Sequence, residues 1–148
     1  MDRRYNNRRG YSQKPKPEEF KFPVINEKLS VVFNDPVELY LPTGKACQYA
    51  KQFDGIPAHQ MRKILNGVKE AKMAADNNDL KTAKTKVFVL VAMSAYNTGR
   101  LKGDLGKLQN FITNTVNEKS IVDADNIDAL DQFFTSVVAY HTQFAKKK

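Results

Sequence analysis

The sequence has few of the residues that enzyme sites usually need. It contains one cysteine, Cys47, and two histidines, His59 and His141. A single cysteine cannot form a disulfide within the chain, which excludes a secreted disulfide scaffold. The sequence has no glycine-rich phosphate loop, no Cys-x-x-Cys pair and no His-Glu-x-x-His motif. These absences predict a protein that is not an enzyme and needs no cofactor or metal.

The remaining candidates for chemistry have simpler interpretations. Cys47 lies on a short predicted helix with no motif around it, so we interpret it as a small buried side chain. His141 lies on the apolar stripe of the last predicted helix and is interpreted as a histidine at the core edge. The acidic run at 123–128 lacks the glycine and the closing glutamate of a calcium loop, which favours helix capping.

Long apolar runs are also missing. The longest, residues 87–96, is interrupted by Ser94 and covers about half of the ~20 residues that a membrane span needs. The basic start of the chain is not followed by the apolar stretch of a signal peptide. We therefore expect a soluble, cytoplasmic protein with no membrane partner.

What the sequence has in excess is positive charge. The formal net charge is +8, from 24 lysines and arginines against 16 aspartates and glutamates. Residues 45–102 carry eleven basic and four acidic side chains, whereas residues 120–135 carry four aspartates and no base. Charge that is segregated in this way predicts one surface that attracts a polyanion such as a nucleic acid.

The chain divides into three parts by composition. Residues 1–22 are rich in Arg, Asn, Lys and Pro without a helical or strand period, which predicts a disordered basic tail that either helps to hold RNA or stays solvated. Residues 23–42 are expected to form an extended arm or a short irregular segment, with a strand as an alternative around Leu29 to Phe33. Residues 43–148 show helical periodicity and predict a helical bundle domain with one core.

The apolar positions of this domain predict about five helices in a single antiparallel all-α bundle. They are expected from Thr43 to the Asp54-Gly55 turn, from Pro57 to Asp76, over about 80–98, over about 104–119, and through Ile127 to Phe144. The third is apolar on nearly every side, so we expect it at the centre of the bundle, ending before Gly99.

A row of polar and basic side chains accompanies the second predicted helix. It contains Arg62, Asn66 and Lys69 at i, i+4 and i+7, with Lys63 and Gln60 beside it. Side chains at this spacing project together, about one to two turns apart, much like successive phosphates of a nucleic-acid strand. The row predicts a face that binds a nucleic-acid backbone without reading its sequence, the alternative being a solvated face.

Three segments resemble, in order, the motifs of the Csm small-subunit family of type III-A CRISPR systems. Residues 57–65 resemble its Ser/Thr-x-Gln-Ile-Arg-Lys-Phe/Leu-Leu helix start, residues 95–100 its Ala-Tyr-x-x-Gly-Arg, and residues 133–141 its Phe-x-Glu-Ala-Ile/Val-Val-Ala-Tyr-His. Together they span about residues 43–145. Thr135 and Ser136 replace the Glu-Ala pair, so no role is carried over for that acid, and the polar cap before Gln60 is replaced by Pro57-Ala-His59.

The resemblance implies a helical, non-catalytic subunit of an antiviral ribonucleoprotein in the cytoplasm of a prokaryote. Such subunits stack in several copies, contact the CRISPR RNA and the target RNA paired to it, and leave the chemistry to other Csm subunits. At the positions that match the family motifs, the resemblance implies that four residues contact RNA: Gln60, Arg62, Lys63 and Arg100. Lys45 and Lys69 are added from their place on the helices, and Tyr96, Tyr140 and the phenylalanines of the last helix are expected in the core.

Three other functions stay open at this point. A helical scaffold or adaptor would use the basic face to bind an acidic protein. A small DNA-binding regulator ranks lower, because no tight turn joins two helices in the manner of a recognition motif. The small subunit of the related Cmr complexes is also helical, basic and similar in length.

Overall fold

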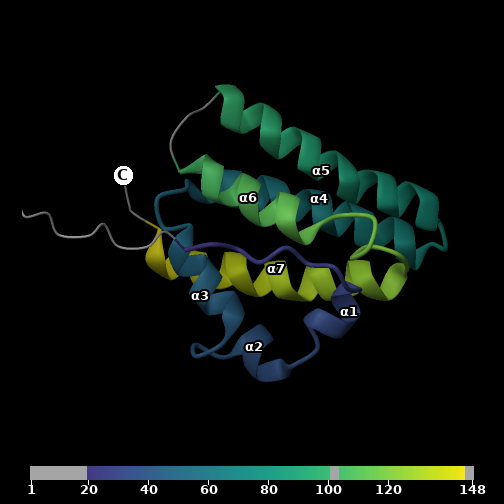
Figure 1. Cartoon of the computed structure of the whole chain (residues 1–148), viewed down its shortest axis with the longest axis horizontal. Coiled ribbons are helices and arrows are strands. Elements are labelled where there is room, and N and C mark those ends of the chain that lie inside the picture. The colour runs from purple at the N-terminus through teal and green to yellow at the C-terminus, as the bar shows by residue number, and fades with distance from the viewer. Residues whose placement is uncertain (1–19, 101–103, 146–148) are drawn as a thin grey trace, which may run out of the picture.

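The computed structural model describes residues 20–100 and 104–145, of which 97–100 are described by their backbone only. Within these ranges it is all-α, as predicted, with seven helices and no strand (Figure 1). The helices are α1 (Leu29–Val32), α2 (Pro36–Tyr40), α3 (Lys45–Gln52), α4 (Ala58–Asp76), α5 (Leu80–Arg100), α6 (Leu105–Thr115) and α7 (Ala124–Phe144). The four long helices α4 to α7 alternate in direction along one axis, and α1 to α3 pack against α7.

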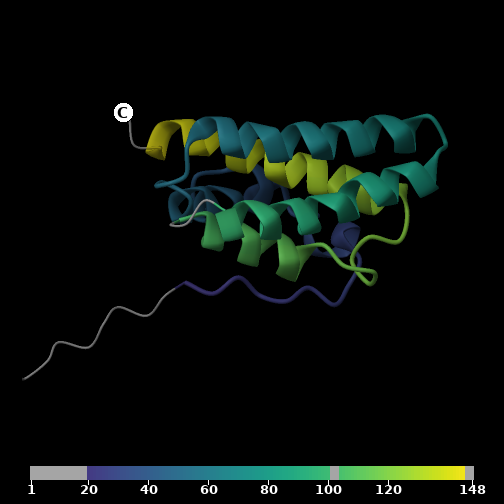
Figure 2. The same ribbon diagram turned by 90° about the horizontal axis from the view of Figure 1, so that it is seen from above.

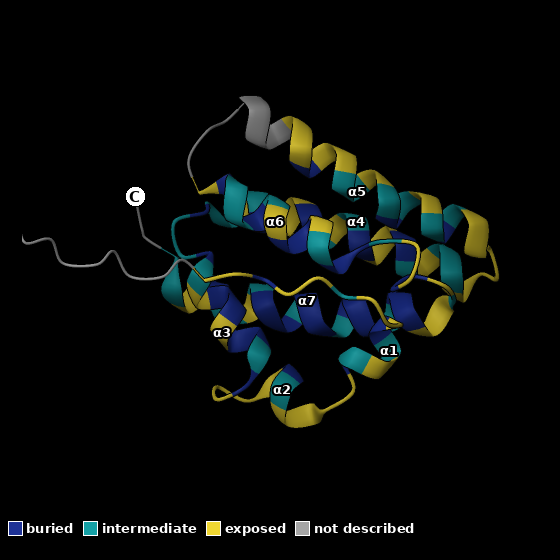
Figure 3. Cartoon of the chain, viewed as in Figure 1, coloured by how far each residue is buried: buried dark blue, intermediate teal, exposed yellow. Residues whose placement is uncertain are grey.

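The helix at the centre of the molecule is α7. It contacts α1, α2, α3, α4 and α5, and most of its length is buried (Figure 3). Phe133 and Val137 are fully buried there, as are Ile127 and nearly all of Phe134. The aromatic ring of Phe133 stacks on Phe33 with the centroids 4.0 Å apart. Phe133 and Phe134 therefore lie in the core, as predicted.

The prediction that the third helix of the bundle, α5, lies at the centre was wrong. It contacts α4 and α6 and only the edge of α7, so its outer side is uncovered (Figure 3). Val89, Met93 and Tyr96 are 49%, 42% and 57% exposed. An apolar helix is enclosed only if the chain supplies neighbours on every side. Here α3 packs on α7 instead, and α6, with 11 residues, covers only part of the length of the 21-residue α5.

Residues 20–28 form an extended strap along the outer side of α6 (Figure 2). The Ile25 N–H donates to the Asn114 carbonyl (2.8 Å), and the Asn114 and Asn117 amides donate to the carbonyls of Phe22 and Ile25 (2.9 Å each). Phe22 is 6% exposed and packs against Tyr49, Phe53 and Phe111. The predicted disorder of residues 1–22 was therefore wrong at Phe22, and residues 1–19 lie outside the described part.

The segment after the strap is helical, so the alternative of a strand around Leu29 was wrong. Leu29 and Phe33 are buried whereas Val31 between them is 54% exposed, which fits one helical turn, because a strand would turn all three to the same face. The Asp35 carboxylate accepts the Val37 N–H (3.0 Å) and Pro36 occupies the first turn of α2. Capping by Asp35 thus starts α2, while α1 has no side-chain cap.

Two helix ends also differ from their predicted positions. The helix α5 continues through Gly99 to Arg100, and α6 ends at Thr115 instead of near 119. After α6, the Asn117 side-chain carbonyl accepts the N–H groups of Lys119 (2.8 Å) and Ser120 (3.0 Å), and the Ser120 hydroxyl donates to the Thr115 carbonyl (2.6 Å). These side chains satisfy backbone groups that a longer helix would use, so the helix stops early.

No helix in the ranges that the structure describes is both long enough and apolar enough to span a membrane.

Candidate nucleic-acid interface

Two contacts fix the register between α4 and α5. The Lys86 ammonium lies 3.3 Å from the Glu70 carboxylate, and a Cβ added to Gly67 would lie 2.5 Å from the Leu90 side chain. Because the helices are antiparallel, each step forward on α4 is a step back on α5. Arg62 and Lys63 are therefore level with residues 93–95, and the end of α5 is level with the start of α4.

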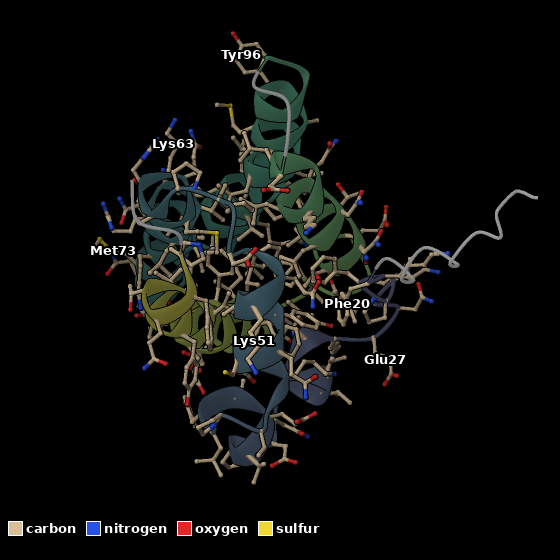
Figure 4. The ribbon with its side chains drawn as sticks, turned by 90° about the vertical axis from the view of Figure 1, so that its left-hand side faces the viewer. Phe20, Glu27, Lys51, Lys63, Met73 and Tyr96 are labelled. Carbon is tan, nitrogen blue, oxygen red and sulfur yellow. The ribbon has the colours of Figure 1, made fainter. Side chains whose placement is uncertain are left out.

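Arg62 and Lys63 follow directly after Met61, whose side chain is fully buried. Met61 and Ile64 face the core, which turns the two cations outward. Both are exposed, and neither has an ion-pair or hydrogen-bond partner in the part of the chain that the structure describes. Figure 4 shows Lys63 projecting from α4 into solvent at this end of the bundle.

The two lysines in the second half of α4 are paired with α7 instead. The Lys69 ammonium lies 2.7 Å from the carboxylate of Asp131, a residue only 7% exposed. The Lys72 ammonium lies 3.0 Å from Asp76 and 3.3 Å from Asp128. Hydrogen bonds to Asp76 and then to Asp128 raise the pKa of Lys72 above its ordinary value. The second half of α4 is therefore close to electrically neutral.

The remaining predicted contacts lie in different places. Gln60 is half-buried, with its amide nitrogen 3.5 Å from Nε2 of His59. Arg100 is the last residue of α5 and is level with the start of α4. Lys45 begins α3 beside α2, and the eight residues of α3, about 12 Å of helix, separate it from the α3–α4 turn. The fold brings Gln60, Arg62, Lys63 and Arg100 to one end of the bundle and leaves Lys45 apart.

The expectation that Tyr96 lies in the core was wrong. The buried side of α5 runs through Ala83, Val87 and Ser94, and Tyr96 lies about 200° around the helix from Ser94. The small side chains at 83 and 94 are the sequence signal for this arrangement, because a helix that packs closely needs small residues at the contact. Tyr140 is half-buried and donates its hydroxyl to the Tyr40 carbonyl (2.7 Å).

Asp131 is a residue whose part in the site went unpredicted. It follows Ile127 by four residues and precedes Phe134 by three, so it belongs to the buried stripe of α7. An aspartate in such a stripe needs a counter-ion, and Lys69 supplies it while Thr135 donates a hydrogen bond to the same oxygen (3.3 Å). An acidic residue at an apolar position was the available signal.

The cysteine, the histidine and the acidic run that were considered for chemistry all have structural roles. Cys47 is buried, as predicted. His141 is fully buried rather than at the core edge, and its Nε2 donates to the Phe53 carbonyl (2.9 Å). In the acidic run, the Asp123 carboxylate accepts the Asn126 N–H while the Asn126 side chain accepts that of Asp123, a reciprocal cap on α7. The capping interpretation is confirmed.

These features define a small all-α protein with an uncompensated cationic surface at one end of its bundle. A family model described as Csm2 Type III-A matches residues 39–147, which is most of the chain. The chain belongs to this family, the small subunit of the type III-A Csm complex, as the three motifs predicted. Comparisons with curated proteins and with solved structures found no match.

Proposed function

We propose that this chain is the non-catalytic, RNA-binding small subunit of a type III-A CRISPR ribonucleoprotein in the cytoplasm of a prokaryote. Several copies stack beside the other Csm subunits and hold the backbone of target RNA paired to the CRISPR RNA. Family membership supports the assignment to the complex. The observation that carries RNA binding is that Arg62 and Lys63 are exposed and have no carboxylate partner in the described residues.

The electrostatics of the start of α4 support this role. The first turn of α4 contains no acidic residue, and no side chain caps it. The helix dipole therefore adds partial positive charge to that of the two cations. Phosphates are held well by such an arrangement, and a guanidinium can bind two phosphate oxygens at once. Contacts of this kind position a strand without selecting its sequence, which guide–target pairing does instead.

The proposed RNA contacts fall into a primary and a secondary set. Gln60, Arg62, Lys63 and Arg100 lie at the same end of the bundle and form the primary set. Lys69 is a secondary contact because a phosphate would compete with Asp131 for its ammonium. Lys45 is secondary because it lies beside α2, away from the others.

A salt titration tests the proposal. Binding to an RNA of arbitrary sequence is measured against salt concentration for the wild type and for the double variant Arg62→Ala/Lys63→Ala. Losing two phosphate contacts lowers the slope of log affinity against log salt by about 1.4 to 1.8. The loss is expected to be uniform across RNA sequences, with unchanged helical circular dichroism.

The matched control is Lys81→Ala/Lys84→Ala, which removes the same charge from the opposite end of α5. It is expected to change the slope much less. Equal slopes in the two double variants would mean that net charge, and not this surface, holds the RNA. Failure of the wild type to bind any RNA at low ionic strength would favour an adaptor that binds an acidic protein.

A further inference from the structure

Tyr96 is the most exposed aromatic side chain among the residues with described side chains. Its ring is 57% exposed on the outer face of α5, two turns after Val89 and almost one after Met93. A large aromatic ring in water is a site where another flat or apolar group can bind, provided that something else brings that group there.

The neighbouring cations supply that attraction. The α4–α5 register places Tyr96 level with Met61, so its ring is within one helical turn of Arg62 and Lys63 along the bundle axis. Adjacent packed helices lie about 8–10 Å apart. In Figure 4, Tyr96 points into solvent at the top of the picture and Lys63 at its upper left. A ring beside two cations that have no carboxylate partner among the described residues matches the two parts of a nucleotide, a flat base and an anionic phosphate.

We propose that Tyr96 is a stacking platform for one unpaired base of the bound RNA, while Arg62 and Lys63 hold the adjacent phosphates. The inference rests on the proposed function and extends it from the backbone to a base. Stacking on an aromatic ring tolerates any base, because every base has a π-face. Tyr96 therefore adds affinity for unpaired nucleotides without adding sequence preference.

The favoured occupant is RNA and not a protein because of charge. Val89 continues the apolar face away from the cations and Met93 is level with Lys63, while Tyr96, level with Met61, is the aromatic member of that face within one helical turn of both cations. A base held at Tyr96 keeps its phosphates within reach of both cations, whereas an apolar protein surface there would leave them without a partner.

The test uses the full chain and a single-stranded RNA that carries 2-aminopurine, whose fluorescence falls when it stacks. Tyr96→Ala is expected to weaken binding by about five- to one-hundred-fold and to remove the quenching. Tyr96→Phe keeps both, and Tyr96→Leu, which keeps apolar bulk without an aromatic ring, behaves like alanine. The salt slope stays at its wild-type value in all three, because no phosphate contact is lost.

Two controls separate stacking from structure. Tyr40 is 49% exposed on α2, away from the cations, so Tyr40→Ala is expected to leave RNA affinity unchanged. Fully duplex RNA, whose bases are already stacked, is expected to bind wild type and Tyr96→Ala equally.

Wild-type affinity in Tyr96→Leu would overturn the stacking role. So would unchanged RNA binding in Tyr96→Ala together with weaker co-purification of the other Csm subunits, which would make this face a protein contact. Both results leave the proposed function intact if the wild type still binds RNA with a salt slope that depends on Arg62 and Lys63. A wild type that binds no RNA would overturn the proposed function as well.

Discussion

The two halves of α4 carry the same number of lysines and arginines but present very different surfaces. Arg62 and Lys63 face solvent with no carboxylate partner among the described residues, whereas Lys69 and Lys72 are paired with Asp131 and Asp128. The difference comes from α7, which runs antiparallel to α4. The availability of Lys69 to a ligand is thus decided by the helix across from it, and that of Lys72 by α7 together with Asp76 of its own helix.

The register of these pairs explains where the division falls. Asp128 and Asp131 are three residues apart on α7, as are Lys72 and Lys69 on α4, so the pairs form one antiparallel ladder. Continuing the ladder places Val138 level with Arg62. No acid occupies that position, and the first half of α4 keeps its charge.

The largest expected effect comes from removing one member of the buried pair. Lys69→Met leaves the Asp131 carboxylate buried, with only the Thr135 hydroxyl as a partner. We expect a loss of about 2–3 kcal/mol in the free energy of unfolding, measured by urea denaturation. Arg62→Met, which removes an unpaired surface cation, should stay within about 0.5 kcal/mol of wild type. Equal losses in the two variants would contradict the distinction between the halves.

The second prediction concerns a variant with a carboxylate on α7 opposite the first half of α4, where the wild type has none. Val138→Glu places a carboxylate level with Arg62, where it competes with RNA phosphates. We expect the salt slope of RNA binding to fall by about 0.7 to 0.9, the value of one phosphate contact. Val138→Gln has the same size and no charge, and it should retain the wild-type slope. If both variants lose slope equally, the ladder does not extend to Arg62.

The third prediction concerns a variant in which the second half of α4 loses a carboxylate partner and so comes to resemble the first half. Asp131→Asn releases the half-exposed Lys69 ammonium, which then becomes available to a phosphate. The salt slope is expected to steepen by up to about 0.9, as measured in the same titration. Asp125→Asn removes an exposed aspartate that has no ion pair in the described structure, and it controls for the change in net charge.

The smallest effect concerns pH. The pKa of Lys72 is raised in the folded protein, first by its hydrogen bond to Asp76, so its interaction stabilises the fold below the ordinary lysine pKa of 10.5. This contribution is lost as the pH rises through the higher folded value. Wild type should therefore be slightly more stable than Lys72→Met at pH 7, with the difference vanishing at strongly alkaline pH. A difference that persists there would assign it to packing of the side chain.

Much of the fold was predictable from periodicity within single helices. The stripes through Met61, Ile64 and Val68 and through Ile127, Phe134 and Val137 predict α4 and α7, and both helices bury those residues. Periodicity does not say which helix lies opposite which. For that reason α5 was expected at the centre, although the central helix is α7.

The candidate site, like the fold, was predictable only as far as patterns within single helices allow. The helix start that holds Gln60, Arg62 and Lys63 follows from a motif and a helical row. The pairing of Lys69 with Asp131 joins residues 62 positions apart, and the exposure of Tyr96 depends on how α4 and α6 cover α5. Such facts belong to the packing of helices against each other, which no pattern on one helix contains.

The hydrogen bond between His141 and the Phe53 carbonyl limits how this chain can vary. The carbonyl lies at the turn from which α4 departs, and the bond to α7 fixes it in the core. An apolar residue at position 141 would remove this bond between α7 and the end of α3 and leave the carbonyl with the Ile56 N–H (2.9 Å) as its donor. A surface cation can be substituted without the loss of such a bond. At position 141, a side chain that donates is needed to keep the hydrogen bond between α7 and the end of α3, where the chain turns into α4.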